Sequence, residues 1–366
     1  MPTVLPYQSF QPDVMPAFLL AHDDENMSTN YDMLELIGEG SFAKVFRCIE
    51  RKTGLEFAAK ELRLTDVEDK EKIEQEIAVW KDLRHENIVS LYSSIREGET
   101  VCLIMEYVAG GSLFDEVIQQ TYYSEKQARL VTRQLLNALE YLHSRRIVHR
   151  DIKPDNLLLK RIGNNVTIKL ADFGLAQALP NDTDVISCGA SGAPMFLAPE
   201  TVLEEPIGRA VDIWACGVIF YLLLVGYPPF WSNSDEQLLL SILRGQYTMP
   251  SPFWDNVSND ARDLVHKLIV VDPEARISAK EALSHPALKE NELTIEENEP
   301  KAKRHFYAAI CGIRAMIKMR KANVKGIGRQ LSESGVDLTP RSPLSPRSPR
   351  SLNAETFADD GEERTF

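Results

Sequence analysis

Residues 149–156 read His149-Arg150-Asp151-Ile152-Lys153-Pro154-Asp155-Asn156, and Asp172-Phe173-Gly174 follows, with Asp172 sixteen residues after Asn156. These two stretches place a carboxylate, a lysine and two oxygen donors that suit a metal ion within one short region. Transfer of a phosphoryl group depends mainly on in-line positioning and on cations that neutralise the phosphate charge. This set of side chains therefore predicts a phosphoryl-transfer site.

The composition is that of an ordinary soluble globular protein. The chain has 366 residues, of which 44% are hydrophobic and 26% charged, enough for about two domains. Its five cysteines are scattered and include no C-x-x-C pair, which argues against a disulfide framework or a zinc site and predicts a cytoplasmic location. The N-terminus lacks the basic start and apolar run of a signal peptide. The net charge of −13 argues against general nucleic-acid binding.

One uncharged segment, residues 213–230, is long enough to be considered as a membrane span. It contains Gly217 and Gly226 and ends in Pro228-Pro229. These interruptions favour a buried core helix, so no membrane span is expected.

The order of predicted elements indicates an α+β fold with two lobes. Residues 31–107 alternate like strands, interrupted by one helix over about 69–83, and the chain becomes mainly helical after Gly110-Gly111. Several of the later helices begin with a Ser-x-x-Glu/Gln capping box, at Ser124, Ser234 and Ser278. A small β-rich lobe followed by a larger α-helical lobe makes the cleft between them the expected ligand site.

Both ends of the chain have compositions that cannot bury a core. Residues 1–30 carry no Lys or Arg and show no sustained period, and they are predicted to be disordered. Residues 326–366 form a tail rich in Ser-Pro pairs among arginines, and we expect it to be disordered and open to modification.

Two features of the small lobe point to phosphate binding. Residues 38–43, Gly-Glu-Gly-Ser-Phe-Ala, precede a strand pattern and not a helix, which favours a hairpin flap over phosphates against a dinucleotide site or a plain turn. Lys60 lies among apolar strand residues, where burial requires a partner charge. Glu76 on the next helix is the candidate partner, although the spacing alone equally fits a solvated carboxylate.

The motifs of residues 31–288, and the order in which they occur, resemble those of a eukaryotic protein kinase. The resemblance rests on the glycine-rich loop, Lys60, the loop at 149–156, Asp172-Phe173-Gly174, Ala198-Pro199-Glu200 and the run Asp212-Ile213-Trp214-Ala215-Cys216-Gly217. It implies a small lobe at 31–108 and a large lobe at 109–288, with ATP and Mg²⁺ as cofactors and protein substrates.

The resemblance assigns roles to the residues of the two opening stretches. Asp151 would accept the proton of the substrate hydroxyl, Lys153 would contact the γ-phosphate, and Asn156 with Asp172 would bind Mg²⁺. A lysine two residues after the aspartate is similar to the serine/threonine kinases, so Ser/Thr substrates are expected.

The resemblance also implies a nucleotide site between the lobes. Lys60 would hold the α- and β-phosphates and pair with Glu76, and the hinge backbone would bind adenine, with Met105 as gatekeeper. Glu200 would pair with Arg276, and Asp212 would hold the catalytic loop. The cofactor-binding residues implied are Ile37, Gly38, Gly40, Val45, Ala58, Lys60, Glu76, Glu106, Val108 and Leu158.

The end of the large lobe is similar to that of calcium/calmodulin-dependent and death-associated protein kinases. An acidic linker, 289–300, is followed by a basic segment, 301–325, with eight Lys and Arg between 300 and 325 and no acid. Within 301–321 the apolar residues are spaced as in an amphipathic helix, which favours an autoinhibitory helix released by calmodulin. A helix permanently packed on the large lobe and a membrane-surface helix remain alternatives. The oligomeric state is not indicated.

Some positions depart from the family pattern. Ala193 stands where many Ser/Thr kinases have Thr, and Ser112 replaces a Glu, with Asp115 or Glu116 as possible substitutes. Ala193 leaves open the alternative of a weakly active or pseudokinase-like nucleotide-binding scaffold. Arg150 suggests a pocket for a phosphorylated residue of the loop that follows, and the candidates are Thr183, Ser187 and Ser191. Residues 329–332, Arg-Gln-Leu-Ser, resemble a site for a basophilic kinase.

Overall fold

The structure is a computed structural model. It describes residues 26–40, 43–64, 67–119, 123–163, 165–181, 184–189, 191–232, 234–289, 326–333 and 336–340. The basic segment 301–325 and all of the acidic linker except Lys289 lie outside these ranges, as does Thr183.

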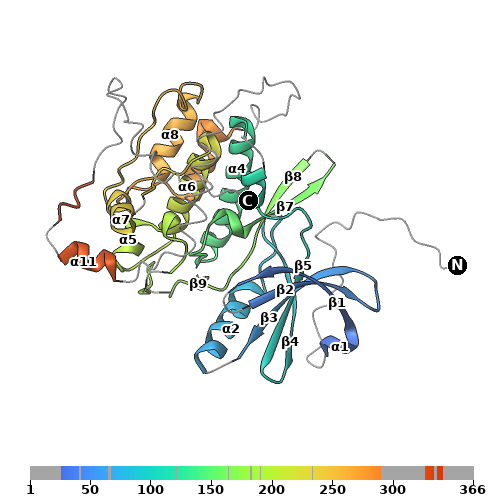
Figure 1. The fold of residues 1–366 in the computed structure, drawn as a ribbon. Coiled ribbons are helices and arrows are strands. Elements are labelled where there is room, and N and C mark those ends of the chain that lie inside the picture. The colour runs from blue at the N-terminus through green and yellow to red at the C-terminus, as the bar shows by residue number, and fades with distance from the viewer. Residues whose placement is uncertain are drawn as a thin grey trace, which may run out of the picture.

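The small lobe is a five-stranded antiparallel sheet in the order β1-β2-β3-β5-β4, with helix α2 beside it (Figure 1). The β1–β2 hairpin carries the glycine-rich turn, as the sequence predicts. The elements are β1 (Tyr31–Glu39), β2 (Ala43–Glu50), β3 (Glu56–Arg63), α2 (Val67–Trp80), β4 (Leu91–Glu97) and β5 (Thr100–Glu106).

Residues 26–30, which the sequence predicts to be disordered, have defined structure. A short helix, α1 (Met27–Asn30), is capped by the Asn26 side chain, which accepts from the Ser28 N–H. Met27 is buried with Phe57 and Ile104 beneath the sheet, and its N–H donates to Glu97 Oε1 at 2.6 Å. The predicted disorder is therefore wrong for residues 26–30, because one apolar side chain that no periodicity marks reaches the small core.

The large lobe is mainly helical, so the predicted two-lobed α+β fold is confirmed. Its strands form two small two-stranded sheets, β6–β9 and β7–β8. The elements are α3 (Leu113–Gln119), α4 (Glu125–Ser144), β6 (Ile147–Val148), η2 (Pro154–Asn156), β7 (Leu157–Ile162), β8 (Asn165–Leu170), β9 (Gln177–Ala178), η3 (Pro194–Phe196), α5 (Pro199–Val202), α6 (Ala210–Val225), α7 (Asp235–Leu243), α8 (Asn259–Leu268), α9 (Ala279–Leu283) and η4 (Pro286–Leu288).

Helix α6 is the centre of the large lobe, and it contains most of the uncharged segment. Every residue from Val211 to Val225 is buried, and α4 and α8 pack against the helix. The segment is thus the core helix that the sequence favours. In the described part of the chain, no helix combines the length and apolar character that a membrane span requires.

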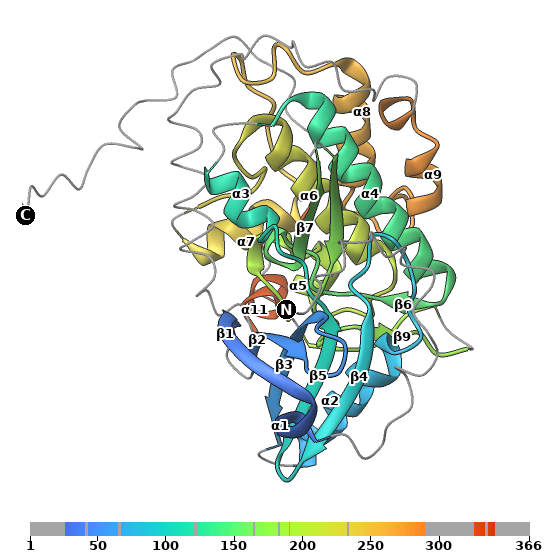
Figure 2. The ribbon, with the colours of Figure 1, turned by 90° about the vertical axis from the view of Figure 1, so that its right-hand side faces the viewer.

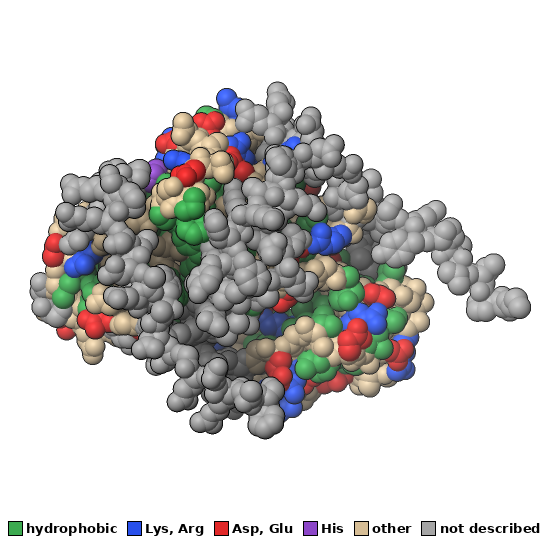
Figure 3. Space-filling view, turned by 45° about the horizontal axis from the view of Figure 1, so that its top comes forward, with side chains coloured by type: hydrophobic (Ala, Val, Ile, Leu, Met, Phe, Trp, Pro, Cys, Tyr) green, Lys and Arg blue, Asp and Glu red, His purple; other side chains and the backbone are tan. Residues whose placement is uncertain are grey.

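The predicted helix starts are confirmed. Ser124 and Ser278 form complete capping boxes with Gln127 and Glu281, and Ser234 accepts from the Gln237 N–H. The predicted pair of Glu200 and Arg276 is also present as a buried, two-pronged contact at 2.7 and 3.0 Å. This pair ties α5 to the loop before α9. On the face seen in Figure 3, charged side chains of both signs are interspersed among apolar ones.

Part of the tail that the sequence predicts to be disordered is ordered. Helix α11 (Ile327–Glu333) contacts α5 and α7, and Leu331 is buried against the large lobe. Figures 1 and 2 both show α11 beside these two helices. The prediction fails here because Leu331 is buried and Val336 and Leu338 pack against the same core, in a tail whose overall composition is polar.

Candidate active site

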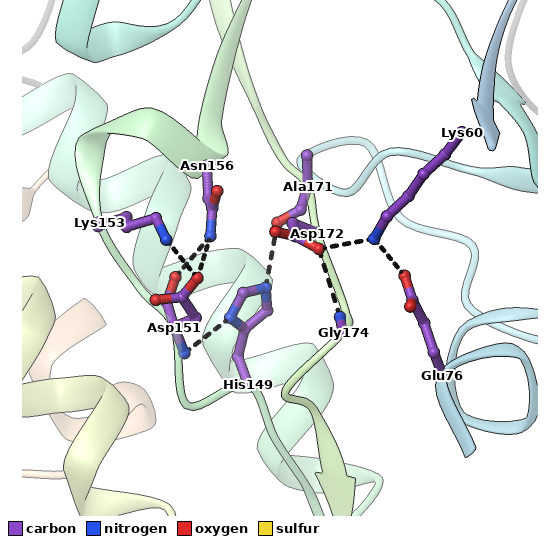
Figure 4. A network of polar contacts seen from close by, with 9 residues as sticks. All are labelled: Lys60, Glu76, His149, Asp151, Lys153, Asn156, Ala171, Asp172 and Gly174. Carbon is purple, nitrogen blue, oxygen red and sulfur yellow. Dashed lines mark hydrogen bonds and ion pairs between the residues drawn. The ribbon is translucent and has the colours of Figure 1, made fainter. Parts of the chain in front are cut away.

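Lys60 is the point at which the two lobes meet electrostatically. Its Nζ lies 2.7 Å from Glu76 Oε1 on α2 and 2.9 Å from Asp172 Oδ1 after β8 (Figure 4). The Lys60 and Glu76 side chains are largely buried, whereas that of Asp172 is 45% exposed. Glu76 is therefore the partner of Lys60 and not a solvated carboxylate. The Asp172 carboxylate remains partly open to solvent.

Lys60 and Asp172 stabilise each other's charged forms, whereas burial raises the pKa of Glu76 despite its contact with Lys60. Burial disfavours the ammonium form of Lys60, but the carboxylates of Asp172 and Glu76 outweigh that effect and raise its pKa. Burial would also raise the pKa of Asp172, yet Lys60 holds it at about 2. Lys60 and Asp172 therefore stay charged throughout the physiological pH range. An ionised, partly exposed carboxylate of this kind can bind a hard cation.

Asp151, Lys153 and Asn156 form a second cluster across the cleft from Lys60 (Figure 4). Lys153 Nζ lies 2.5 Å from Asp151 Oδ2, and Asn156 Nδ2 donates to the same oxygen at 2.9 Å and to the Asp151 carbonyl at 2.8 Å. Because its nitrogen is bound to Asp151, Asn156 offers its amide oxygen to a cation. The predicted catalytic residues are thus brought together.

The loop that carries Asp151 is held in a strained conformation. Arg150 has a φ of +69°, a conformation that costs a non-glycine residue about 1–3 kcal/mol. Asp212 on α6 stabilises it, because its two carboxylate oxygens accept the backbone N–H groups of His149 and Arg150 at 3.0 and 2.9 Å. His143 on α4 lies 2.9 Å from the same carboxylate. Asp212 is therefore placed as the sequence expects.

An aromatic stack joins α2 to this loop. The Phe173 ring is fully buried, stacked on Trp80 at 5.3 Å and edge-on to His149 at 5.0 Å between centroids. Asp172 and Gly174 are thereby fixed on either side of a core residue. Sequence reasoning included His149 in the loop but did not identify Trp80 as its neighbour, because no pattern relates a helix end to a loop about 70 residues later.

The residues expected around adenine lie on the small-lobe sheet and on β7. Val45 pairs with Lys60, and Ala58 pairs with Met105, across the sheet register. Leu158 on β7 forms an isolated backbone bridge with Ser112. Ile37 is 43% exposed, as suits a residue that a ligand would cover. In the glycine-rich loop that begins at Gly38, the Gly40 N–H donates to the Ala43 carbonyl at 2.9 Å and joins the two strands of the hairpin.

The hinge itself is anchored by two lysines. Glu106 accepts from Lys160 Nζ at 3.0 Å and from Lys169 Nζ at 2.8 Å, so that its side chain points to β7 and β8. The Glu106 backbone N–H donates to the Ser90 carbonyl at 2.9 Å. Lys169 is nearly fully buried, and its position between Ile168 and Leu170 in an apolar strand was an available signal that sequence reasoning missed. After the hinge, position 110 requires a glycine, because a Cβ there would lie 1.9 Å from the Leu159 carbonyl oxygen.

The loop before α5 brings Ala193 to the Asp151 cluster. Asp151, Gly192 and Ala193 line one small cavity together with Leu197, Thr201 and Asp212. Gly192 has a φ of +111°, and a Cβ at this position would lie 3.4 Å from Asp151 Oδ1. Ala193 thus lines the same cavity as Asp151 and has no polar side-chain group of its own.

The structure also describes the surroundings of Arg150 and of Ser112, two positions that the sequence singled out. Arg150 Nη1 donates to the Leu175 carbonyl and to Gln177 Oε1, at 3.3 and 3.1 Å, while Ser187 is exposed and Ser191 half-buried. Phosphorylation of these serines stays a prediction. Ser112 caps α3, because its Oγ accepts the Asp115 N–H at 3.1 Å, and Asp115 Oδ2 accepts from the Ser112 N–H and Oγ at 3.2 and 2.6 Å.

The predicted metal ligands are a carboxamide and a single carboxylate. Asn156 and Asp172 both project toward the space between the two clusters in Figure 4. Within the described ranges no group of three or more His, Cys, Asp or Glu side chains is arranged to hold a metal ion. Oxygen donors of these types suit Mg²⁺, which usually completes its shell with water and phosphate oxygens.

Comparison with known proteins agrees with this geometry. Residues 31–288 match the family described as "Protein kinase domain". The chain is 43% identical over 261 residues to the calcium/calmodulin-dependent protein kinase type II alpha chain of Drosophila melanogaster, covering 71% of this chain and 49% of that protein. It is 43% identical over 258 residues to the type II delta subunit of Oryctolagus cuniculus, covering 70% and 48%. The chain therefore spans about half the length of these relatives.

The buried His149 predicts a pH dependence of stability. Burial lowers the pKa of His149 below its ordinary 6.5, and Nδ1 accepts from the Asp151 N–H at 3.3 Å, which requires the neutral ring. The unfolded chain binds a proton below pH 6.5 that the folded chain does not, so stability falls as the pH drops. Between pH 7.5 and 5.5 we expect His149 to contribute about 1 kcal/mol of this loss.

Urea unfolding of the wild type and of His149→Phe at both pH values measures this contribution. His85 and His266, whose pKa values burial also lowers, are present in both proteins and cancel in the comparison. An equal pH-dependent loss in the two proteins would show that His149 is not held neutral.

Proposed function

The chain belongs to the protein kinase family, and on that premise we propose that it transfers the γ-phosphate of Mg-ATP to serine and threonine hydroxyls of proteins. The observation that carries the proposal is the arrangement of the two clusters. Lys60 and Asp172 lie on one side of the cleft and Asp151, Lys153 and Asn156 on the other, as phosphate binding and hydroxyl activation require.

Asp151 is the proton acceptor in this proposal. Its Oδ1 is the oxygen that lies nearer Gly192 and the cavity, while Oδ2 is held by Lys153 and Asn156. A substrate hydroxyl beside Asp151 would lose its proton to the carboxylate as its oxygen attacks the γ-phosphorus and the bond to the β-phosphate oxygen breaks. Lys153 would stabilise the charge on the phosphoryl oxygens.

Lys60 and the hinge bind the nucleotide. The Lys60 ammonium is already oriented by Glu76, so little side-chain entropy is lost when it contacts the α- and β-phosphates. Ile37, Val45, Ala58 and Leu158 supply apolar contacts to adenine, and the backbone at Glu106 and Val108 supplies hydrogen bonds. Asn156 and Asp172 fit as ligands of Mg²⁺, which when bound neutralises phosphate charge.

The same geometry disfavours the nucleotide-binding scaffold. Such a protein would tolerate loss of the polar contacts around Asp151, yet the contacts of Lys153, Asn156 and Asp212 to this loop are all present. The substitution at Ala193 removes one hydroxyl from the site and leaves these contacts intact.

We further propose that calmodulin controls the activity. The relatives are named as calcium/calmodulin-dependent kinases, and residues 301–321 have the basic, amphipathic pattern of a calmodulin target. An autoinhibitory helix in this segment would block the cleft until calmodulin removes it. Protein substrates and a cytoplasmic location complete the proposal, and the free thiols Cys48, Cys102, Cys188 and Cys216 are consistent with a reducing compartment.

Asp151→Asn tests the catalytic assignment. Removal of the proton acceptor should lower phosphate transfer from radiolabelled ATP to a basic peptide by about a hundredfold or more. Asp155→Asn, a carboxylate removed four residues along the same loop, is the matched control and should retain activity. Equal incorporation by wild type and Asp151→Asn would end the enzyme assignment. Activity of the wild type that does not respond to Ca²⁺/calmodulin would leave catalysis standing and remove the proposed switch.

Ala193→Thr tests whether the missing hydroxyl limits the enzyme. A threonine hydroxyl in the cavity can hydrogen-bond the ionised Asp151 and align it with the acceptor, which should raise kcat by up to about tenfold. Ala193→Val has nearly the same shape without the hydroxyl and should not raise kcat. A similar rise in both variants would attribute the effect to packing.

A further inference from the structure

The tail segment is the name we give to residues 326–340, of which the structure describes 326–333 and 336–340. Helix α11 contacts both helices, and Figures 1 and 2 place it beside them. Within the described residues 336–340, the Asp337 carbonyl accepts a hydrogen bond from Arg244 at the end of α7. A polar segment beyond the basic region therefore has a defined position on the folded domain.

Leu331 is the most deeply buried apolar residue among those whose burial the structure describes in this segment. Leu331 is 5% exposed and belongs to the core cluster of the large lobe, whereas its neighbours Gln330 and Ser332 are exposed. Val336 and Leu338 pack against the same cluster and are partly buried. In the part of the segment whose side chains the structure describes, these three residues supply the apolar contacts, and a contact of this size can open without unfolding the lobe beneath it.

A polar contact fixes the direction of the segment. Arg244 Nε donates to the backbone carbonyl of Asp337 at 2.9 Å, six residues after the leucine. The Asp337 side chain in turn accepts from the Thr339 N–H at 2.9 Å and shapes the turn that presents this carbonyl. The surface thus recognises an aliphatic anchor followed, at a fixed spacing, by a backbone acceptor.

This surface adjoins the place where a protein substrate would enter. Helix α5 follows directly on the loop 191–198, whose Ala193 lines the cavity beside Asp151. A folded substrate that brings a hydroxyl to Asp151 would extend over α5, while a short peptide or a nucleotide need not. Occupation of the α5–α7 surface should therefore act on protein substrates in particular.

We propose that the α5–α7 surface is a docking site for extended polypeptides, and that the tail segment occupies it in cis and competes with protein substrates. The binding part stands on the contacts of Leu331 and Arg244 alone, and only the competition with substrates rests on the proposed kinase function. A tethered segment has an effective concentration of about 1 mM, so it can exclude an external ligand with the same contacts.

The binding test uses a fluorescent peptide of residues 326–340 and full-length protein. Leu331→Asp places a charge where the anchor is buried and should free the surface, so this variant should bind the peptide. The wild type and Gln330→Asp, which adds the same charge at the exposed neighbouring position, should bind it at least about tenfold more weakly, because the tethered segment stays in place. In the Leu331→Asp background, Arg244→Ala should weaken peptide binding about tenfold. Absence of peptide binding to Leu331→Asp would overturn the docking site.

Kinetics then test the competition. In Leu331→Asp the KM for a protein substrate should fall by about threefold or more while the KM for ATP is unchanged, and Gln330→Asp should match the wild type. An unchanged KM for the protein substrate in a variant that binds the peptide would refute competition. If no variant transfers phosphate, the kinase proposal fails, and peptide binding still decides the docking site.

Discussion

The need to neutralise the buried ammonium of Lys60 constrains the rest of the site. A charge on a central strand of the small lobe is costly unless a partner meets it, and Glu76 on α2 and Asp172 from the large lobe do so at 2.7 and 2.9 Å. One ion cluster therefore determines where α2 lies on the sheet and where the chain after β8 enters the cleft. A nucleotide would meet these charges already in place.

The same principle operates on the opposite side of the cleft. The loop around Asp151 includes a left-handed Arg150, and it remains in this conformation because Asp212, buried on α6, accepts two of its backbone N–H groups. Phe173 links the two sides, since it packs on Trp80 at the end of α2 and on His149 beside Asp151. Displacement of α2 would thus disturb both Lys60 and the loop.

The sequence predicted the parts of this arrangement that are local in the chain. The lobe division, the capped helices and the residues in each motif follow from periodicity and from short runs, and the resemblance to protein kinases correctly paired Lys60 with Glu76. Contacts between distant and chemically unremarkable residues could not be read in this way. Lys169 reaches Glu106 across 63 residues, and Leu331 gives a polar tail its anchor. In both cases the burial of one side chain determines the local structure, and the composition of the surrounding segment does not reveal it.

A double-mutant cycle of Lys60→Met and Glu76→Gln, with kcat for phosphate transfer as the readout, tests the central role of the ion cluster most directly. If Glu76 acts only by holding Lys60, the double variant should be no slower than Lys60→Met, because a residue that positions another has no effect once its partner is gone. Losses of the two single variants that multiply in the double variant would show that the residues act independently, and would contradict this account.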